Sequence, residues 1–252
     1  MVIAKSVAGF IVASSMLFPA AVTAGPPPPL KGGVVQSFPG ISVVDSKIQP
    51  EPAYGHAEVI ACIESALNTK IDWQSLPTDR LLKLTRENQL DLIYPMGYTE
   101  ERDSYLQASA WLTKDDDYFV FKAAKIQPAM FHQQQIKTQP VGVKRGSPQQ
   151  HYLQKNGFQY VHQVYDYQQL LPLLIMDRVD MLAVPQPLAE QLQAEMQTDP
   201  ATATLQLYHY YTRDAGFYLS PAFARNNLAQ MNAAVVACRQ HTKTATAIKQ
   251  KS

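Results

Sequence analysis

Short apolar runs alternate with amphipathic segments from about residue 30 onward, and turn residues separate them. This alternation predicts an α/β fold with a mostly parallel sheet. In the first third of the chain, we predict strands over residues 33–38, 70–73 and 90–96 and helices over residues 57–67 and 78–87. Three β–α steps therefore begin a first lobe.

A second series of the same kind follows an aromatic strand, residues 118–122, and a glutamine-rich loop that marks a lobe boundary. Its predicted strands are residues 141–143, 159–163 and 179–184, and its predicted helices are residues 148–155, 167–176 and 188–196. Strands over 205–211 and 216–220 and a helix over 226–239 complete the chain. We predict two α/β lobes joined by two crossing strands: 25–122 belong to the first lobe, 123–208 form the second, and 209–252 return to the first.

Residues 1–24 have the pattern of a secretory signal peptide, because Lys5 precedes an apolar stretch of small residues that ends in Val22-Thr23-Ala24. The stretch is short for a membrane span, and an uncleaved anchor is the alternative. No cysteine stands near the cleavage site to receive a lipid. We therefore expect export to the periplasm, cleavage near Ala24 and no membrane insertion of the mature protein.

The charge balance argues against a nucleic-acid partner. The chain has 22 basic and 21 acidic residues, and residues 1–24 contain one lysine and no acid, so the mature chain has 21 of each and a formal charge of 0. Neither this balance nor any basic run suggests nucleic acid or a membrane surface. The remaining 228 residues (252 minus 24), in a chain that is 46% hydrophobic, suffice for well-formed cores.

Cys62 and Cys238 are the only cysteines. An oxidising compartment favours a disulfide between them, and two separate buried thiols are the alternative. A bond would place the final helix beside the helix that carries Cys62.

The most informative stretch is 88–112, where an apolar strand is followed by Gly97-Tyr98-Thr99-Glu100-Glu101-Arg102 at the start of a helix. Open α/β sheets bind small ligands where the carboxyl end of a strand meets the amino end of a helix. Arg102 offers a planar fork of donors that matches a carboxylate. Thr99 can cap the helix and also donate to a ligand. The alternative is a surface arginine paired with an acidic neighbour.

Several short motifs occur in a fixed order along the chain. They are Gln89-Leu90-Asp91-Leu92-Ile93, Thr99-Glu100-Glu101-Arg102, Ser109-Ala110-Trp111, Val141-Gly142-Val143-Lys144-Arg145-Gly146-Ser147 and Asp177-Arg178-Val179-Asp180. Together they resemble the family 3 extracellular solute-binding proteins of the polar-amino-acid type, whose fold is the two-lobed type II periplasmic binding fold. The resemblance spans about Gly33 to Gln240. It implies that Arg102 grips a ligand carboxylate and that Gly146 and Ser147 form the contact from the second lobe.

Two departures from the family pattern bear on the ligand. Amino-acid-binding members usually carry an acidic residue just beyond the motif at Asp177–Asp180, whereas this chain continues from Met181 to Gln186 without one. Gly97 also lacks the hydroxyl common at its position. These differences argue against a standard α-amino acid and favour a carboxylate-bearing solute or a neutral solute with ring character.

Aromatic rings could supply the apolar part of the site, although each is also a core candidate. In order of preference they are Phe38, Tyr98, Tyr94 and Tyr54. The predicted ligand-binding residues are Arg102, Thr99, Ser147, Gly146, Tyr98, Gly97, Phe38, Tyr94, Gln186 and Thr78.

Motifs for catalysis or metal binding are missing from the sequence. The six histidines show no HExxH or close paired spacing, and there is no G-x-S-x-G elbow or phosphate-binding loop. Asp115-Asp116-Asp117 could attract a cation, but a solvated turn is the expected interpretation. We expect neither cofactor nor enzymatic activity.

The sequence thus predicts a monomeric periplasmic protein that binds a small, carboxylate-bearing molecule by closing two lobes and delivers it to an ABC-type permease. A ligand-sensing accessory that presents its state to a sensor protein is the first alternative. An exported lyase on the same fold is the second.

Overall fold

The computed structural model describes residues 28–50, 55–196 and 204–241. The predicted signal peptide, residues 1–24, and Tyr54 lie outside these ranges. The described residues form one sheet of nine strands, in the order β4-β1-β5-β11-β7-β10-β8-β9 with β6 beside β11, and a two-stranded ribbon of β2 and β3. The strands are β1 (Leu30–Val35), β2 (Val43–Val44), β3 (Lys47–Ile48), β4 (Ile71–Leu76), β5 (Leu92–Gly97), β6 (Gln107–Ala108), β7 (Thr113–Lys122), β8 (Val141–Lys144), β9 (Val161–Val164), β10 (Met181–Pro185) and β11 (Leu205–Leu219).

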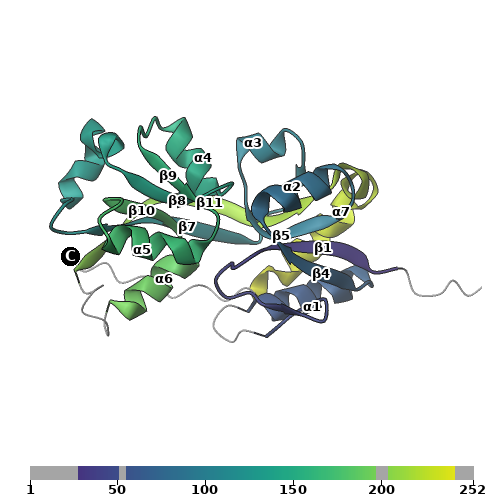
Figure 1. The fold of residues 1–252 in the computed structure, drawn as a ribbon. Helices are drawn as coiled ribbons and strands as arrows, with labels where there is room; N and C mark the ends of the chain where they lie inside the picture. Colours follow the sequence, from purple (N-terminus) through teal and green to yellow (C-terminus); the bar gives the residue numbers. More distant parts are fainter. Residues whose placement is uncertain (1–27, 51–54, 197–203, 242–252) are drawn as a thin grey trace, which may run out of the picture.

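Helices surround the two ends of this sheet, so that the molecule has two lobes (Figure 1). The helices are α1 (His56–Leu67), α2 (Thr78–Arg86), α3 (Glu100–Asp103), α4 (Pro148–Lys155), α5 (Leu170–Ile175), α6 (Gln186–Glu195) and α7 (Pro221–Cys238), with 3-10 helices η1 (Pro128–His132), η2 (Gln134–Thr138), η3 (Tyr167–Gln169) and η4 (Arg239–His241). In the first lobe β1 pairs in parallel with β4 and β5, and in the second lobe β8 pairs in parallel with β9 and β10. The α/β class and the two-lobed arrangement predicted from the sequence are confirmed.

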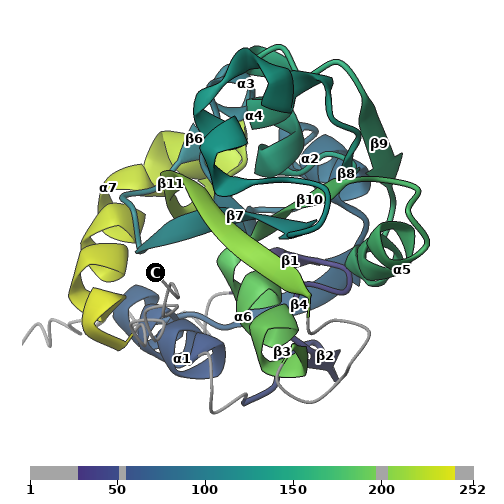
Figure 2. The same cartoon turned by 90° about the vertical axis from the view of Figure 1, so that its left-hand side faces the viewer.

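Two long antiparallel strands, β7 and β11, connect the lobes. β11 pairs with β5 in the first lobe and with β7 over most of its length, and β7 also pairs with β10 in the second lobe. Figure 2 shows β11 as one continuous strand across the molecule. The prediction of two separate strands, 205–211 and 216–220, is wrong here, because the polar residues between them pair with the equally polar start of β7.

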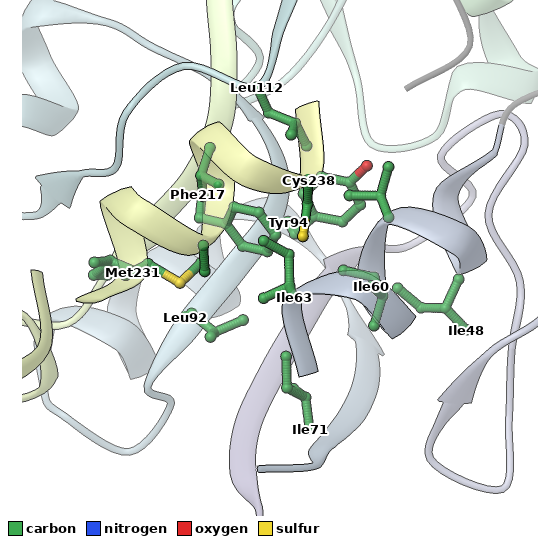
Figure 3. Close-up of a cluster of buried hydrophobic side chains, with 14 of the residues drawn as sticks. Ile48, Ile60, Ile63, Ile71, Leu92, Tyr94, Leu112, Phe217, Met231 and Cys238 are labelled. Carbon is green, nitrogen blue, oxygen red and sulfur yellow. The ribbon is translucent and has the colours of Figure 1, made fainter. Parts of the chain in front are cut away.

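The interior of the first lobe is built around the contact between α1 and α7 (Figure 3). Val59, Ile60 and Ile63 of α1 are buried, as the helical spacing of these apolar residues predicts. Cys62 and Cys238 form a disulfide with a Cα–Cα distance of 5.7 Å. The predicted disulfide and the position of the final helix beside α1 are therefore confirmed.

The second lobe buries both faces of its strands. Helices α5 and α6 contribute leucines to one cluster, and η1 and η2 cover the other face with Met130, Phe131 and Ile136. The segment predicted as a glutamine-rich loop therefore contains two 3-10 helices that cover the sheet. Its apolar residues pack against β7 and β8, while the glutamines between them stay at the surface.

Candidate functional site

The lobes meet around a small inner cavity of about 40 Å³. Six of the predicted ligand-binding residues line it, namely Phe38, Thr78, Gly97 and Arg102 from the first lobe and Gly146 and Ser147 from the second. One water needs roughly 10–15 Å³, so this space holds about three waters, far less than the roughly 300–1,000 Å³ of an ordinary ligand site. The structure is therefore a closed form, and a solute of ordinary size needs the lobes to part before it can enter.

Arg102 joins the two lobes at the centre of this interface. The backbone N–H of Arg102 donates to Oγ1 of Thr99, which caps α3 at 3.3 Å. Its guanidinium donates from Nη1 to the carbonyl of Gly97 at 2.8 Å and from Nη2 to the carbonyl of Gly146, in the other lobe, at 2.7 Å. The residue is only 3% exposed, and burial lowers the pKa of its guanidinium. Among the described residues, no carboxylate lies within ion-pair distance of it, which argues against a surface pairing with Glu101.

The second-lobe contact has a tighter geometry than the sequence suggests. Gly146 has φ +69°, and a Cβ there would lie 2.7 Å from Oδ1 of Asp79, so both the backbone and the approach of the lobes require glycine. Its N–H donates to Oε1 of Gln150 at 2.7 Å, so this backbone donor already has a partner within the second lobe. Ser147 caps α4 by accepting from the N–H of Gln150 at 3.2 Å, so its own O–H remains able to donate.

Lys144, at the end of β8, is a buried residue at the lobe interface that was not among the predicted ligand-binding residues. It is 3% exposed, and its Nζ donates to Oγ1 of Thr78 in the first lobe at 2.7 Å and lies 5.3 Å from the ring centre of Tyr167. Burial lowers its pKa to about 8, an effect that the carboxylates of Asp166 and Asp79 partly offset. The signal was a lysine at the end of a short strand whose other residues are apolar.

The acidic residues Asp115–Asp117 lie in β7, and the prediction of a solvated turn is wrong. Because side chains alternate along a strand, Asp115 and Asp117 both face the cavity while Asp116 faces away. Asp117 is fully buried and forms an ion pair with Arg213 of β11, which is also buried. Burial raises the pKa of the Asp115 carboxyl.

Two glutamines differ in their relation to the cavity. Nε2 of Gln149 donates to Oδ1 of Asp117 at 2.5 Å, and because a carboxylate only accepts, this fixes the orientation of the amide. Oε1 of Gln149, buried beside the cavity, has no hydrogen-bond partner among the described residues. Gln186 follows Pro185, which lines the cavity, but its amide donates along its own helix to Glu190 at 2.9 Å.

The predicted aromatic contacts lie in two different places. Phe38 lines the cavity and packs edge-on against Tyr167 of the second lobe, with 6.4 Å between ring centres. Tyr98 packs in a core cluster of the first lobe. Tyr94 stacks on Phe217 at 4.6 Å within the core shown in Figure 3. The structure therefore places Phe38 at the cavity and the two tyrosines behind it.

A larger polar groove of about 370 Å³ lies outside the inner cavity, between α2 and α3 on one side and α4 on the other. Arg102, Gly146 and Ser147 line both spaces, and Thr99 lines the outer groove. The hydrogen bond from Arg102 to Gly146 thus stands between the inner cavity and the groove.

The part of the chain that the structure describes contains no group of three or more histidine, cysteine or acidic side chains arranged to hold a metal ion. Within the same residues, none of the helices has the length and apolar character that a membrane span requires.

Comparison with known proteins identifies the fold. No protein-family model matches the chain, and no curated protein sequence matches it either. Solved structures do: an ancestral arginine-binding protein bound to arginine has a TM-score of 0.67 and 17% identity, covering 86% of this chain and 94% of that one. The arginine-, lysine-, histidine-binding protein ArtJ from Geobacillus stearothermophilus has a TM-score of 0.66 and 13% identity, covering 83% and 88%.

A histidine kinase sensor domain described as similar to periplasmic binding proteins has a TM-score of 0.70 and 12% identity, covering 84% of this chain and 90% of that one. All three neighbours are named for binding or sensing. The chain therefore has the fold of the two-lobed periplasmic binding proteins, in agreement with the resemblance to the polar-amino-acid type.

Proposed function

We propose that this protein is an exported binding protein that closes its two lobes around a small, carboxylate-bearing solute and delivers it to an ABC-type permease. The observation that carries the proposal is Arg102, a buried guanidinium at the lobe interface with no carboxylate partner among the described residues. In this proposal residues 1–24 are removed on export, and the mature chain acts as a monomer with the lobe boundaries predicted from its sequence.

The charges of the cleft support an anionic ligand. An arginine has five N–H donors, and described residues use two of those on the Arg102 guanidinium. Lys144 is a second buried cation, and its hydrogen-bond partner among the described residues is a hydroxyl, that of Thr78. Burying a charge without an ion-pair partner is costly, so an anion held between these groups stabilises the closed form. Binding then shifts an open–closed equilibrium, and a membrane partner recognises the closed state.

Sensing is a second candidate, and the fold of the histidine kinase sensor domain favours it. In that case the same closure is reported to a signalling protein rather than to a permease. Co-purification of the exported protein with a permease or with a signalling protein distinguishes the two roles. Conversion of a bound solute into a product would instead favour an exported lyase.

Calorimetric titration with amino acids, dicarboxylates, aromatic acids and oligopeptides tests the ligand class. Arg102→Ala should weaken binding of an anionic hit at least tenfold, and Arg102→Lys should restore little because it lacks the planar fork. Arg225→Ala, an exposed position on α7, is the matched control and should bind like the wild type. Unchanged affinity in Arg102→Ala would refute the role of Arg102, and binding of neutral solutes alone would refute the anionic class.

A further inference from the structure

The acidic side of the cleft already contains a cation that belongs to the chain. In the pairing of β7 with β11, Arg213 stands directly opposite Asp115, and Asp117 lies two residues away on the same face. All three side chains line the inner cavity. The ion pair between Arg213 and Asp117 is almost completely buried, with side chains 6% and 1% exposed.

The surroundings of Arg213 are shaped to hold it. A Cβ at position 97 would lie 2.6 Å from Cδ of Arg213 and 3.0 Å from Cγ of Pro148, so the glycine at position 97 leaves the space that the arginine fills. The guanidinium carbon also lies 5.0 Å from the ring centre of Tyr211. Gln149 donates to the other carboxylate oxygen of Asp117. The hydroxyl missing at Gly97 is thus explained by the arginine beside it.

We propose that Arg213 is a built-in cation that occupies the acidic side of the cleft, so that the site rejects solutes carrying an ammonium or guanidinium group and selects anions without one. The proposal deepens the proposed function and rests on it, since it assigns the specificity of the same cleft. The chain's own guanidinium pairs with Asp117, the buried carboxylate that a cationic solute would need.

The count of charges around the cavity supports this assignment. Arg102 and Arg213 line the cavity together with Asp115 and Asp117, and the Arg213–Asp117 pair neutralises one charge of each sign. Lys144 is buried close enough to Arg102 for the two cations to repel each other. Burial also raises the pKa of Asp115, which favours its uncharged form. A solute ammonium would therefore compete with Arg213 for Asp117 and approach two further cations. An anion meets Arg102 and Lys144 without that competition.

Removal of the built-in cation should create a site for a free one. In Arg213→Ala, methylguanidinium at millimolar concentration should raise the melting temperature in a saturable way, relative to potassium chloride at the same ionic strength. In the wild type and in the surface control Arg225→Ala, methylguanidinium should change the melting temperature no more than potassium chloride does. Their affinity for methylguanidinium should be at least tenfold weaker than that of Arg213→Ala. Arg213→Met/Asp117→Asn, which removes both charges of the pair, should not respond.

Gly97→Ala is the second variant, because the added methyl group displaces Arg213 without removing it, and it should also gain binding of methylguanidinium. If Arg213→Ala does not fold, the response of Gly97→Ala to methylguanidinium tests the proposal instead. The proposal is overturned if neither variant responds more strongly than the wild type, or if the wild type binds L-arginine or L-lysine as tightly as it binds a dicarboxylate. A wild type that binds no anion, combined with a response of Arg213→Ala, would refute the proposed function and leave the assignment of Arg213 standing.

Discussion

Nζ of Lys144 lies 2.7 Å from Oγ1 of Thr78, so a buried ammonium of the second lobe is held by a hydroxyl of the first. Thr78→Val keeps the shape of the side chain and removes this acceptor. Hydrogen bonds to charged groups contribute about 1.5–3 kcal/mol, so we expect the closed form to lose about this much stability. Small-angle X-ray scattering should then show a larger radius of gyration.

Thr85→Val is the matched control for this change. Thr85 lies in the same helix and is buried, but its hydroxyl donates to the carbonyl of Leu81 at 2.9 Å, within the first lobe. The radius of gyration of Thr85→Val should equal that of the wild type. Equal scattering of Thr78→Val and the wild type would show that this bond does not hold the lobes together.

Lys144 should give the protein a distinct dependence on alkaline pH. Its pKa is about 8 in the folded protein, against about 10.4 in an unfolded chain. Below pH 8 Lys144 is protonated in both the folded and the unfolded state, so the folded protein bears the full cost of burying the charge. Between pH 8 and about pH 10.4 the unfolded chain holds more protons than the folded protein, so the free energy of unfolding rises with pH. Urea unfolding at pH 7.5, 8.5 and 9.5 should show the wild type gaining stability relative to Lys144→Met. A constant difference would contradict the lowered pKa.

His56 should destabilise the protein in acid. Burial lowers its pKa to about 4 in the folded protein, from 6.5, against a smaller opposite effect of Glu58. As pH falls through this interval, only the unfolded chain takes up the proton, and about 3 kcal/mol of stability is lost at 1.36 kcal/mol per pKa unit. His56→Gln should lose less stability than the wild type between pH 7 and pH 4.5 in urea unfolding. His162→Gln, at an exposed position, should lose as much stability as the wild type over this pH range. If His56→Gln also loses as much as the wild type, His56 is not the group responsible.

The disulfide should contribute strongly to stability. It joins Cys62 to Cys238 across 176 residues, and closing a loop of this length stabilises by about 5 kcal/mol in the chain-entropy model. At about 2–4 °C per kcal/mol for a domain of this size, reduction should lower the melting temperature by about 10–20 °C. The double variant Cys62→Ser/Cys238→Ser should melt at this lower temperature and not respond to reductant. An unchanged melting temperature on reduction would rule out this contribution.

Local sequence patterns predicted much of the fold because, in these elements, the residues that determine the structure lie close together in the chain. The spacing of Val59, Ile60 and Ile63 predicts a helix with one buried face, and α1 has that face. Thr99 and Ser147 have the side chains that cap helices, and both accept the capping bond in the structure. These signals lie within a few residues of each other, so the sequence alone can reveal them.

The charged interior of the cleft was not predictable in the same way. Asp115–Asp117 resemble a turn until β11 supplies the cross-strand partner Arg213, which is about 100 residues away in the chain. Lys144 has a buried partner only because the lobes close and bring Thr78 to it. Arg102 was expected to meet a ligand, but its observed partners are backbone carbonyls, which no side-chain pattern reveals. These contacts depend on long-range pairing and not on local propensity.

The antiparallel pairing of β7 with β11 affects how a protein of this fold can evolve. Lys122 of β7 and Leu205 of β11 stand directly opposite each other, so the described residues between them, 123–196 and 204, form an insert in a long hairpin. The core clusters of the first lobe take no residue from this insert. The insert can therefore be replaced by another sequence without any change to the core of the first lobe. Such an exchange would replace Lys144 and Ser147 but keep Arg102 and Arg213, so part of the polar lining between the lobes would change while the rest stayed the same.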